Sequence, residues 1–239
     1  MARRPEVRVK RKDIKEVRRR QQQRTRLMTM GIIGAVAVLI FVAVIATIQG
    51  TRVTGDFIIP ESQPRPMAVR NAMGDPNAPI QIEEFSDYLC SHCKSFALTQ
   101  EPGIVSDYIA TGDVYFKYVP FSFMAPESGR AAEASYCAAD QEKFWEYHDI
   151  IFENVGTATT QPLADSRLIQ YAEALELNVD SFRSCLTGNT YRDQIQQDLS
   201  YGRQLGITGT PTFNLHGKLV GRGELVQEIE AELARLGSD

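Results

Sequence analysis

The sequence has few residues of the kind that bind metals, with three histidines and four cysteines among 239 residues. Two of the cysteines lie close together, in Cys90-Ser91-His92-Cys93. A structural zinc site built on such a pair needs a second pair of ligands. Cys137 and Cys185 are too far apart in the sequence to form one, and His148 and His216 each stand alone. We therefore expect no metal site.

The Cys-x-x-Cys pair has other possible meanings. A haem-attachment motif has His directly after the second cysteine, whereas Lys94 follows Cys93 here. A static structural disulfide across two residues gains little chain entropy, because the loop that it closes is short. We favour a redox-active pair and keep the static disulfide as an alternative.

Charge is distributed very unevenly along the chain. Residues 1–26 contain 12 of the 26 Lys and Arg and 3 of the 30 Asp and Glu, which gives this arm a net charge of +9. The remaining 14 basic and 27 acidic side chains give residues 27–239 a net charge of −13. The two parts of the chain must therefore meet different surroundings.

A single stretch explains this division. Leu27 to Ile48 is a run of 22 uncharged residues, and a helix of that length crosses a hydrocarbon core of roughly 30 Å. The positive-inside rule then places the arm (1–26) in the cytoplasm and the rest of the chain outside. A cleaved signal peptide is the alternative, but signal peptides have shorter basic and apolar segments. We expect a single-pass anchor (27–48) in the cell membrane, with the arm against anionic headgroups rather than nucleic acid.

The remaining sequence indicates one domain, without internal repeats or long low-complexity tracts. Glycines and prolines mark 49–66 as a linker, so the domain is expected at 67–239, with a first short strand at Met67 to Val69. Further elements are expected in this order: strand 80–85, helix 94–110, strand 114–119, hairpin 212–220 and helix 225–236. Helical spacing of apolar residues between about 126 and 205 predicts an inserted helical block. This order predicts an α/β domain.

A Cys-x-x-Cys pair that opens a helix has a specific chemistry. The free N–H groups and dipole of the helix N-terminus favour an anion, so Cys90 is the expected nucleophilic thiolate. Cys93, one helical turn further on, is the expected resolving thiol. His92 adds a polar neighbour that stabilises the Cys90 thiolate further. Stabilising the reduced form makes the disulfide form more oxidising.

Four motifs together resemble those of the DsbA-like thiol–disulfide oxidoreductases, and most of all the membrane-anchored Gram-positive and actinobacterial type. They are GDPNAP at 74–79, EFSDYLCSHC at 84–93, KFWEYH at 143–148 and GITGTPTF at 206–213. The resemblance covers about residues 67–237. It implies a thioredoxin fold with an inserted helical domain, here preceded by a single transmembrane helix.

The resemblance also assigns roles to residues outside the cysteine pair. It implies that Pro211 is cis and that the Thr210 backbone lies against the Cys90 sulfur, free to pair with an extended substrate peptide. It places Glu84 beneath the site as a buried acid that exchanges a proton with Cys93. Strand alternation supports this role, because Glu83 and Glu84 point to opposite faces of a strand.

One position departs from the family pattern. Ser91 stands where the family often has proline. The His at position 92 favours an oxidant, but the departure at Ser91 leaves the redox potential open.

Cys137 and Cys185 both lie in the predicted helical block. In an oxidising compartment an even number of cysteines favours a second disulfide between them. Some members of the resembled family have such an extra bridge. Two buried free cysteines are the alternative.

These observations lead us to expect a membrane-tethered oxidase that introduces disulfides into unfolded or reduced exported proteins. A quinone-linked membrane partner, DsbB-like or of the vitamin K epoxide reductase type, is expected to reoxidise it. No cofactor, no nucleic-acid partner and a monomer are expected. The alternatives are a reductase or isomerase of the same fold and a non-catalytic thioredoxin-fold binding module.

Overall fold

A computed structural model of the chain describes residues 56–156 and 161–237, together with a few positions between Met28 and Val38. Two compact units are present, Met1–Arg52 and Val53–Asp239. The predicted arm (1–26), most of the predicted anchor (27–48) and residues 49–55 of the predicted linker lie outside the described residues. Among the residues that are described, no helix has the length and apolar character needed to cross a membrane.

The second unit is built on a mixed sheet, which has five strands in the described residues, in the order β1-β3-β2-β4-β5. The strands are β1 (Ala72–Met73), β2 (Ile80–Ser86), β3 (Val114–Pro120), β4 (Thr212–Leu215) and β5 (Lys218–Gly221). β2 and β3 are parallel, and β4 lies antiparallel to the other side of β2. A parallel pair needs a long crossover, which α2 (Ser91–Thr99), α3 (Glu101–Ile104) and the π-helical turn η1 (Val105–Ile109) supply. The predicted strands at 80–85 and 114–119 and the hairpin at 212–220 are confirmed.

The predicted first strand at Met67 to Val69 is wrong. Met67 and Arg70 both have positive φ angles, of 51° and 54°, so the chain turns there. Met67 and Val69 remain 64% and 70% exposed, because no neighbouring element covers them. The strand forms instead at Ala72–Met73, where both residues are buried and pair with β3.

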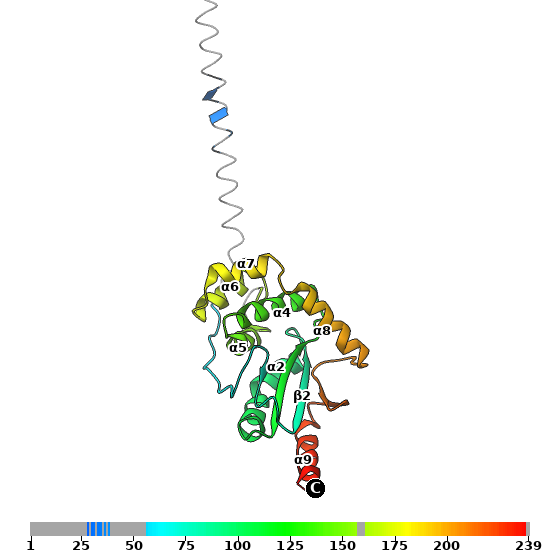
Figure 1. The fold of residues 1–239 in the computed structure, drawn as a ribbon. Coiled ribbons are helices and arrows are strands. Elements are labelled where there is room, and N and C mark those ends of the chain that lie inside the picture. Colours follow the sequence, from blue (N-terminus) through cyan, green and yellow to red (C-terminus); the bar gives the residue numbers. More distant parts are fainter. Residues whose placement is uncertain are drawn as a thin grey trace, which may run out of the picture. The chain divides into compact units, whose positions relative to one another are not determined.

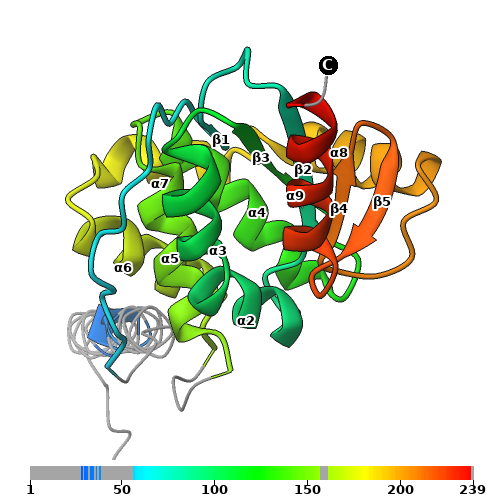
Figure 2. The same ribbon diagram turned by 90° about the horizontal axis from the view of Figure 1, so that it is seen from below.

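The helical insertion predicted at about 126–205 is confirmed. It consists of α4 (Pro126–Ala139), α5 (Phe144–Asn154), α6 (Asp165–Ala174), α7 (Val179–Thr187) and α8 (Arg192–Gln204), and α9 (Leu225–Leu236) ends the domain. Figure 1 shows α4 to α7 gathered at one end of the sheet and α9 at the other. In Figure 2 the β4–β5 hairpin and α9 lie on the side away from α6 and α7. The insertion therefore lies at the end of the sheet where β2 leads into α2.

A small second core holds α8 against that end of the sheet. It contains Phe85, Val119, Phe121, Leu199 and Ile207, all buried. Gly202 allows the close approach, because a Cβ atom there would lie 2.5 Å from the Phe121 ring. This contact fixes the start of the loop that leads from α8 to Pro211.

Part of the predicted linker belongs to the folded unit. We call residues 57–66 the N-terminal strap. The Phe57 ring lies 5.1 Å from that of Tyr171, and the Asn154 side chain bonds both the N–H and the carbonyl of Ile58, at 2.8 and 2.7 Å. The strap is held because its backbone polar groups and its one aromatic side chain find partners on the insertion.

Candidate active site

The two cysteines of the Cys-x-x-Cys pair occupy different environments at the start of α2. Cys90 is the N-cap residue of the helix and is 7% exposed, whereas Cys93 is completely buried. Both are free thiols in this structure. Ser91 and His92 lie in the first turn, with exposed side chains. The predicted roles of Cys90 as nucleophile and Cys93 as resolving thiol are consistent with this placement, because Cys93 is the more buried of the two.

Asp87, which sequence reasoning missed, positions the loop between β2 and Cys90. Its carbonyl accepts the Cys90 N–H at 2.9 Å, and its buried carboxylate accepts the Leu89 N–H at 2.8 Å. The same carboxylate accepts the N–H groups of Phe123 and Met124 at 3.0 and 3.1 Å. The bond to Leu89 is a local Asx turn that Asp before a helix favours. The bonds to the loop after β3 have no signal in the local sequence.

We expect Asp87→Ala to lower the free energy of unfolding by about 3 kcal/mol, because it leaves three part-buried N–H donors without their acceptor. Asp87→Asn keeps one acceptor oxygen and is expected to lose about 1 kcal/mol. Urea denaturation of both variants measures the difference. Equal losses in the two variants would show that the carboxylate bonds are not what holds the two loops together.

The environment of Cys90 favours its thiolate. Hydrogen bonding from Cys93 lowers the pKa of Cys90 to about 5, against the opposing effect of burial, with further help from the Thr210 side chain and the N–H groups of Cys93 and His92. Burial raises the pKa of Cys93, and the bond to Cys90 and the charge of Glu84 raise it further. At neutral pH the reduced pair therefore holds one thiolate, at Cys90, and one thiol, at Cys93.

The Thr210-Pro211 pair faces the reactive sulfur. The peptide bond between Thr210 and Pro211 is cis, as predicted. The Cys90 sulfur lies 3.3 Å from the Thr210 carbonyl oxygen, to which it donates a hydrogen bond when it is protonated, and this contact joins segments 120 residues apart in the chain. The contact between the Thr210 backbone and Cys90 is thereby confirmed.

Glu84 is fully buried in the strand that leads to the cysteines. It pairs in register with Tyr118 of β3 and Phe213 of β4. Neither carboxyl oxygen has a hydrogen-bond partner of good geometry. Burial raises the pKa of Glu84 well above its ordinary value, and the charge of Glu101 adds to this effect. The burial that we predicted for Glu84 is confirmed, and its exchange of a proton with Cys93 remains a prediction.

A cluster of ionisable side chains lies beside the strap. Ligand-type atoms of Glu101, His148 and Asp149 lie within 4.8 Å of one another, and all three residues are buried. Arg65 donates to the Glu101 carboxylate and, at 2.6 Å, to that of Asp149. The chain itself thus supplies the positive charge that two buried carboxylates need.

The second pair of cysteines is bonded. Cys137 in α4 and Cys185 in α7 form a disulfide, with their Cα atoms 5.9 Å apart. This confirms the predicted bridge and excludes the alternative of two free thiols. The bond lies within the helical insertion and takes no part in the reactive pair.

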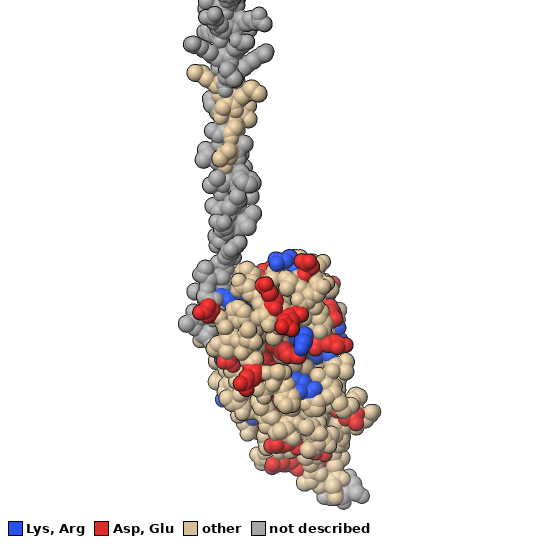
Figure 3. All heavy atoms as spheres, turned by 90° about the vertical axis from the view of Figure 1, so that its left-hand side faces the viewer, with Lys and Arg blue, Asp and Glu red and all other residues tan. Residues whose placement is uncertain are grey.

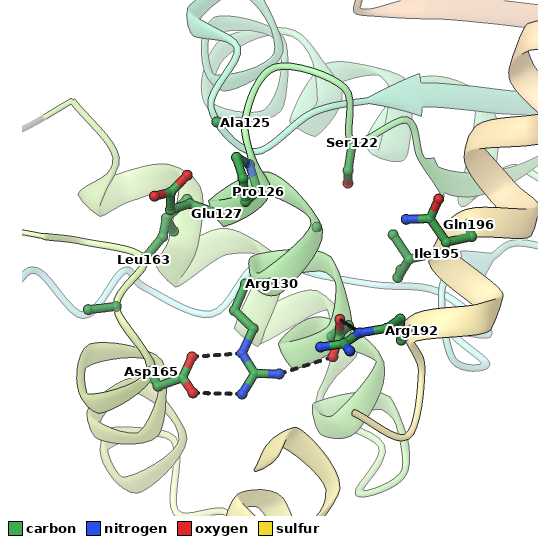
Figure 4. A pocket seen from close by; sticks show the side chains of 13 residues that line it. Ser122, Ala125, Pro126, Glu127, Arg130, Leu163, Asp165, Arg192, Ile195 and Gln196 are labelled. Carbon is green, nitrogen blue, oxygen red and sulfur yellow. Dashed lines mark hydrogen bonds and ion pairs between the residues drawn. The ribbon is translucent and has the colours of Figure 1, made fainter. Parts of the chain in front are cut away.

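A cavity of about 660 Å³ lies between α4, the start of α6 and α8 (Figure 4). Arg130 binds both carboxylate oxygens of Asp165, at 2.7 and 2.6 Å, and reaches Glu133 at 3.0 Å. The residues that line the cavity include neither Cys90 nor Cys93. The bonds of Arg130 connect α4 to α6, so the charged side chains of the cavity have a structural role.

The surface of the domain is acidic. On the face shown in Figure 3, Asp and Glu are spread more widely than Lys and Arg. This agrees with the net charge of −13 counted over residues 27–239. A surface of this sign repels polyanions.

A sheet of this topology, with a Cys-x-x-Cys pair at a helix N-terminus opposite a cis proline, defines a thiol–disulfide oxidoreductase of the thioredoxin fold. The sequence model of a family described as thioredoxin matches residues 68–233. The chain belongs to this thioredoxin family.

Relatives of known name agree with this class. A Bacillus cereus protein described as probable disulfide bond formation protein D is 25% identical over 200 residues, 81% of this chain and 90% of that protein. Disulfide bond formation protein D of Bacillus subtilis is 29% identical over 168 residues, 67% of this chain and 76% of that protein. The crystal structure of oxidised BdbD from Bacillus subtilis has a TM-score of 0.63 and 27% identity, and covers 75% of this chain and 100% of that chain. The predicted resemblance to DsbA-like enzymes is confirmed.

Proposed function

We propose that this protein is a membrane-tethered disulfide oxidase that acts outside the cytoplasm on unfolded or reduced exported proteins. The observation that supports this most directly is the environment of Cys90, in which hydrogen bonding from Cys93 lowers the Cys90 pKa to about 5. A stabilised thiolate favours the reduced enzyme, and a stable reduced form makes the disulfide a strong oxidant.

In the proposed reaction a substrate thiolate attacks the Cys90 sulfur of the Cys90–Cys93 disulfide. The bond between the two enzyme sulfurs breaks, and a mixed disulfide forms between Cys90 and the substrate. A second substrate thiolate then attacks the substrate sulfur of this bond and releases Cys90 as a thiolate. The substrate gains one disulfide and loses two electrons, and the enzyme pair gains both electrons.

The Cys93 sulfur leaves in the first step and needs a proton, because its pKa is raised by burial. We assign this proton transfer to Glu84, because burial raises the pKa of its carboxyl group well above the ordinary value. Cys90 needs none, because it remains a thiolate. One of the two protons of the substrate thiols is thus retained on the enzyme, and the other goes to solvent.

The location and partners in this proposal rest on the sequence. The basic arm at 1–26 and the uncharged run at 27–48 favour a cytoplasmic N-terminus and an extracytoplasmic domain. An oxidase that turns over must return two electrons to an acceptor. A quinone-linked membrane protein of DsbB or vitamin K epoxide reductase type fits that need, because the tether would hold the two proteins in one membrane.

The redox titration of the Cys90–Cys93 pair tests the proposal. We expect a potential nearer to about −120 mV than to about −270 mV. We also expect thiolate absorbance of the reduced protein to appear with a midpoint near pH 5, and to be absent in Cys90→Ser. A potential close to that of thioredoxin would favour the reductase or isomerase.

The low pKa of Cys90 also affects the stability of the reduced protein. Folding lowers the Cys90 pKa from 9.0 to about 5. The stabilisation of the reduced folded protein is therefore complete above about pH 9 and is lost as the pH falls through about 5.

A further inference from the structure

Arg222 lies between β5 and α9, next to two segments that form the reactive site. In the hairpin of β4 and β5, Gly221 pairs in register with Thr212. Arg222 follows this pair on one strand and Pro211 precedes it on the other, so antiparallel pairing brings both to the same end of the hairpin. The Arg222 guanidinium also donates to the Ser95 hydroxyl of α2 at 3.0 Å. The side chain thus connects the end of the hairpin with the active-site helix.

The position of Ser95 brings Arg222 toward the reactive sulfur. Ser95 comes four residues after Ser91 in α2, so their side chains lie on the same face of the helix. Ser91 directly follows Cys90 and is exposed. On the other side of the sulfur, the loop before β4 presents the Thr210 carbonyl, 3.3 Å from Cys90. A peptide that is bonded to Cys90 and paired with Thr210 therefore has Arg222 beside it.

The Arg222 guanidinium has no anionic partner among the described residues. The side chain is half-buried, and none of the ion pairs within 56–156 and 161–237 includes it. In the same part of the chain its side chain has one hydrogen bond, to the neutral hydroxyl of Ser95, although a guanidinium has five N–H donors. A partly buried cation with free donors is a ready site for an anion.

The basic side chain of α2 itself is already bonded elsewhere. Lys94 donates to the carbonyls of Glu153 and Val155 at the end of α5, at 2.9 and 2.7 Å. Its ammonium group therefore satisfies the C-terminus of α5. Because 27 acidic and 14 basic residues occupy 27–239, a cation with free donors beside the reactive pair differs in sign from most of the charge on the domain.

A cavity of about 280 Å³ next to Arg222 gives a bound side chain room. Phe96 and Leu225 line it and are buried, and Asp107 also lines it. Asp107 accepts a bond from the Ser106 hydroxyl at 2.6 Å and forms no ion pair with Arg222 in the described structure. The guanidinium is therefore open to a carboxylate from outside the chain.

We propose that Arg222 selects substrates that carry an acidic side chain two residues from the reacting cysteine. A carboxylate matches the planar guanidinium, which can bind both of its oxygens. In an extended peptide, side chains two residues apart point to the same side. A side chain two residues from the cysteine thus faces the enzyme as the cysteine does, and the adjacent side chains face away. The inference rests on the reaction at Cys90 proposed above and names the substrate class of that site.

The test uses the reduced full-length protein with Cys93→Ala and peptides whose single cysteine is bonded to thionitrobenzoate. The Cys90 thiolate attacks the peptide sulfur, the bond from this sulfur to thionitrobenzoate breaks, and a disulfide forms between Cys90 and the peptide. Thionitrobenzoate leaves as a coloured thiolate, because a thiol of low pKa is the better leaving group. Absorbance then gives the second-order rate constant. The peptides carry Glu, Gln or Lys two residues before the cysteine, two residues after it, or directly beside it.

The ratio of the rate constants for Glu and Gln peptides measures the selection. We expect a ratio of about 10 at one of the two positions that lie two residues from the cysteine, since a hydrogen bond to a charged group contributes that much. Only one position responds, because pairing with Thr210 fixes the direction of the peptide. Arg222→Gln is expected to bring the ratio to about 1, and Arg222→Glu to favour the Lys peptide instead. A purely structural role of Arg222 would change all rates together and preserve their ratio.

Ser95→Ala is a second variant that keeps the charge and removes the bond that positions it. It is expected to lower the ratio without reversing it. Added salt is expected to lower the ratio in the wild type, because the contact is electrostatic and partly exposed.

Arg183→Gln is the matched control. Arg183 is exposed in α7 and has no ion pair among the described residues, and α7 lies away from the β4–β5 hairpin (Figure 2). Its substitution removes the same charge and is expected to keep the ratio of the wild type.

The outcomes separate this inference from the proposed oxidase. A ratio near 1 in the wild type, an unchanged ratio in Arg222→Gln, or an equal preference at the adjacent positions would overturn the selection by Arg222 alone. Absence of exchange with every peptide would overturn the role of Cys90 as well. The redox potential, on which the oxidase proposal depends, does not enter a ratio measured with one enzyme and one leaving group.

Discussion

Cys93→Ala is expected to turn the enzyme into a trap that holds its partner as a mixed disulfide. The Cys90 thiolate attacks a disulfide in a peptide, bonds to one sulfur and releases the other as a thiolate. In the wild type Cys93 lies one helical turn away, fully buried beside the first sulfur, and its attack on the mixed bond is intramolecular. Without it, the lifetime of the adduct is expected to rise at least about 10³-fold, because a positioned neighbouring group is far more effective than a free thiol.

Mass spectrometry under non-reducing conditions measures the trap, with a peptide that contains one disulfide as the partner. Cys90→Ala is the matched control and is expected to give no adduct, since the remaining thiol at Cys93 is buried and its pKa is raised. Equal adduct in the two variants would contradict the assignment of Cys90 as the nucleophile. No adduct in Cys93→Ala would favour the non-catalytic binding module.

Removing the Cys137–Cys185 disulfide is expected to lower the free energy of unfolding by about 4 kcal/mol in the chain-entropy model. The bond closes a loop with a sequence separation of 48, so the unfolded chain regains considerable freedom when the bond is absent. A loss of this size is a large fraction of the usual stability of a domain. For a domain of this size it corresponds to a fall in melting temperature of roughly 8–16 °C.

Urea denaturation of Cys137→Ala/Cys185→Ala measures the loss. The comparison is best made in a Cys90→Ala/Cys93→Ala background, where the reactive pair cannot exchange with the structural bond. Reductant is expected to weaken this parent by the same amount and to leave the variant without any cysteine unchanged. A difference below about 1 kcal/mol would mean that the unfolded chain is already constrained in this region.

The prediction of the site from the sequence succeeded where one short segment contains both the reactive group and its environment. Cys90 and Cys93 are three positions apart, and the helix that they open supplies the N–H groups that stabilise the thiolate. Alternation in β2 correctly placed Glu84 on the buried face. The same local reasoning failed at Met67 to Val69, because apolar side chains form a strand only where another element covers them.

Contacts between segments that are far apart in the sequence could not be predicted from any local pattern. Asp87 bonds a loop 36 residues further on, and Arg65 bonds carboxylates 36 and 84 residues away. The predicted linker gave no sign of this, since a strap and a linker have similar composition. Whether such a segment packs depends on the partners that the fold brings to it.

The sequence by itself determined the chemistry of this protein: the reactive pair, the strand and helix that present it, and the proline that faces it. These features depend on the short-range geometry of the backbone and on the intrinsic properties of the thiols. Only the tertiary structure decided the electrostatic setting of the pair, from the carbonyl of Thr210 to the burial of Glu84 and Cys93. The reason is physical, because burial and Coulomb interactions depend on distances in space, and only the folded chain sets those distances.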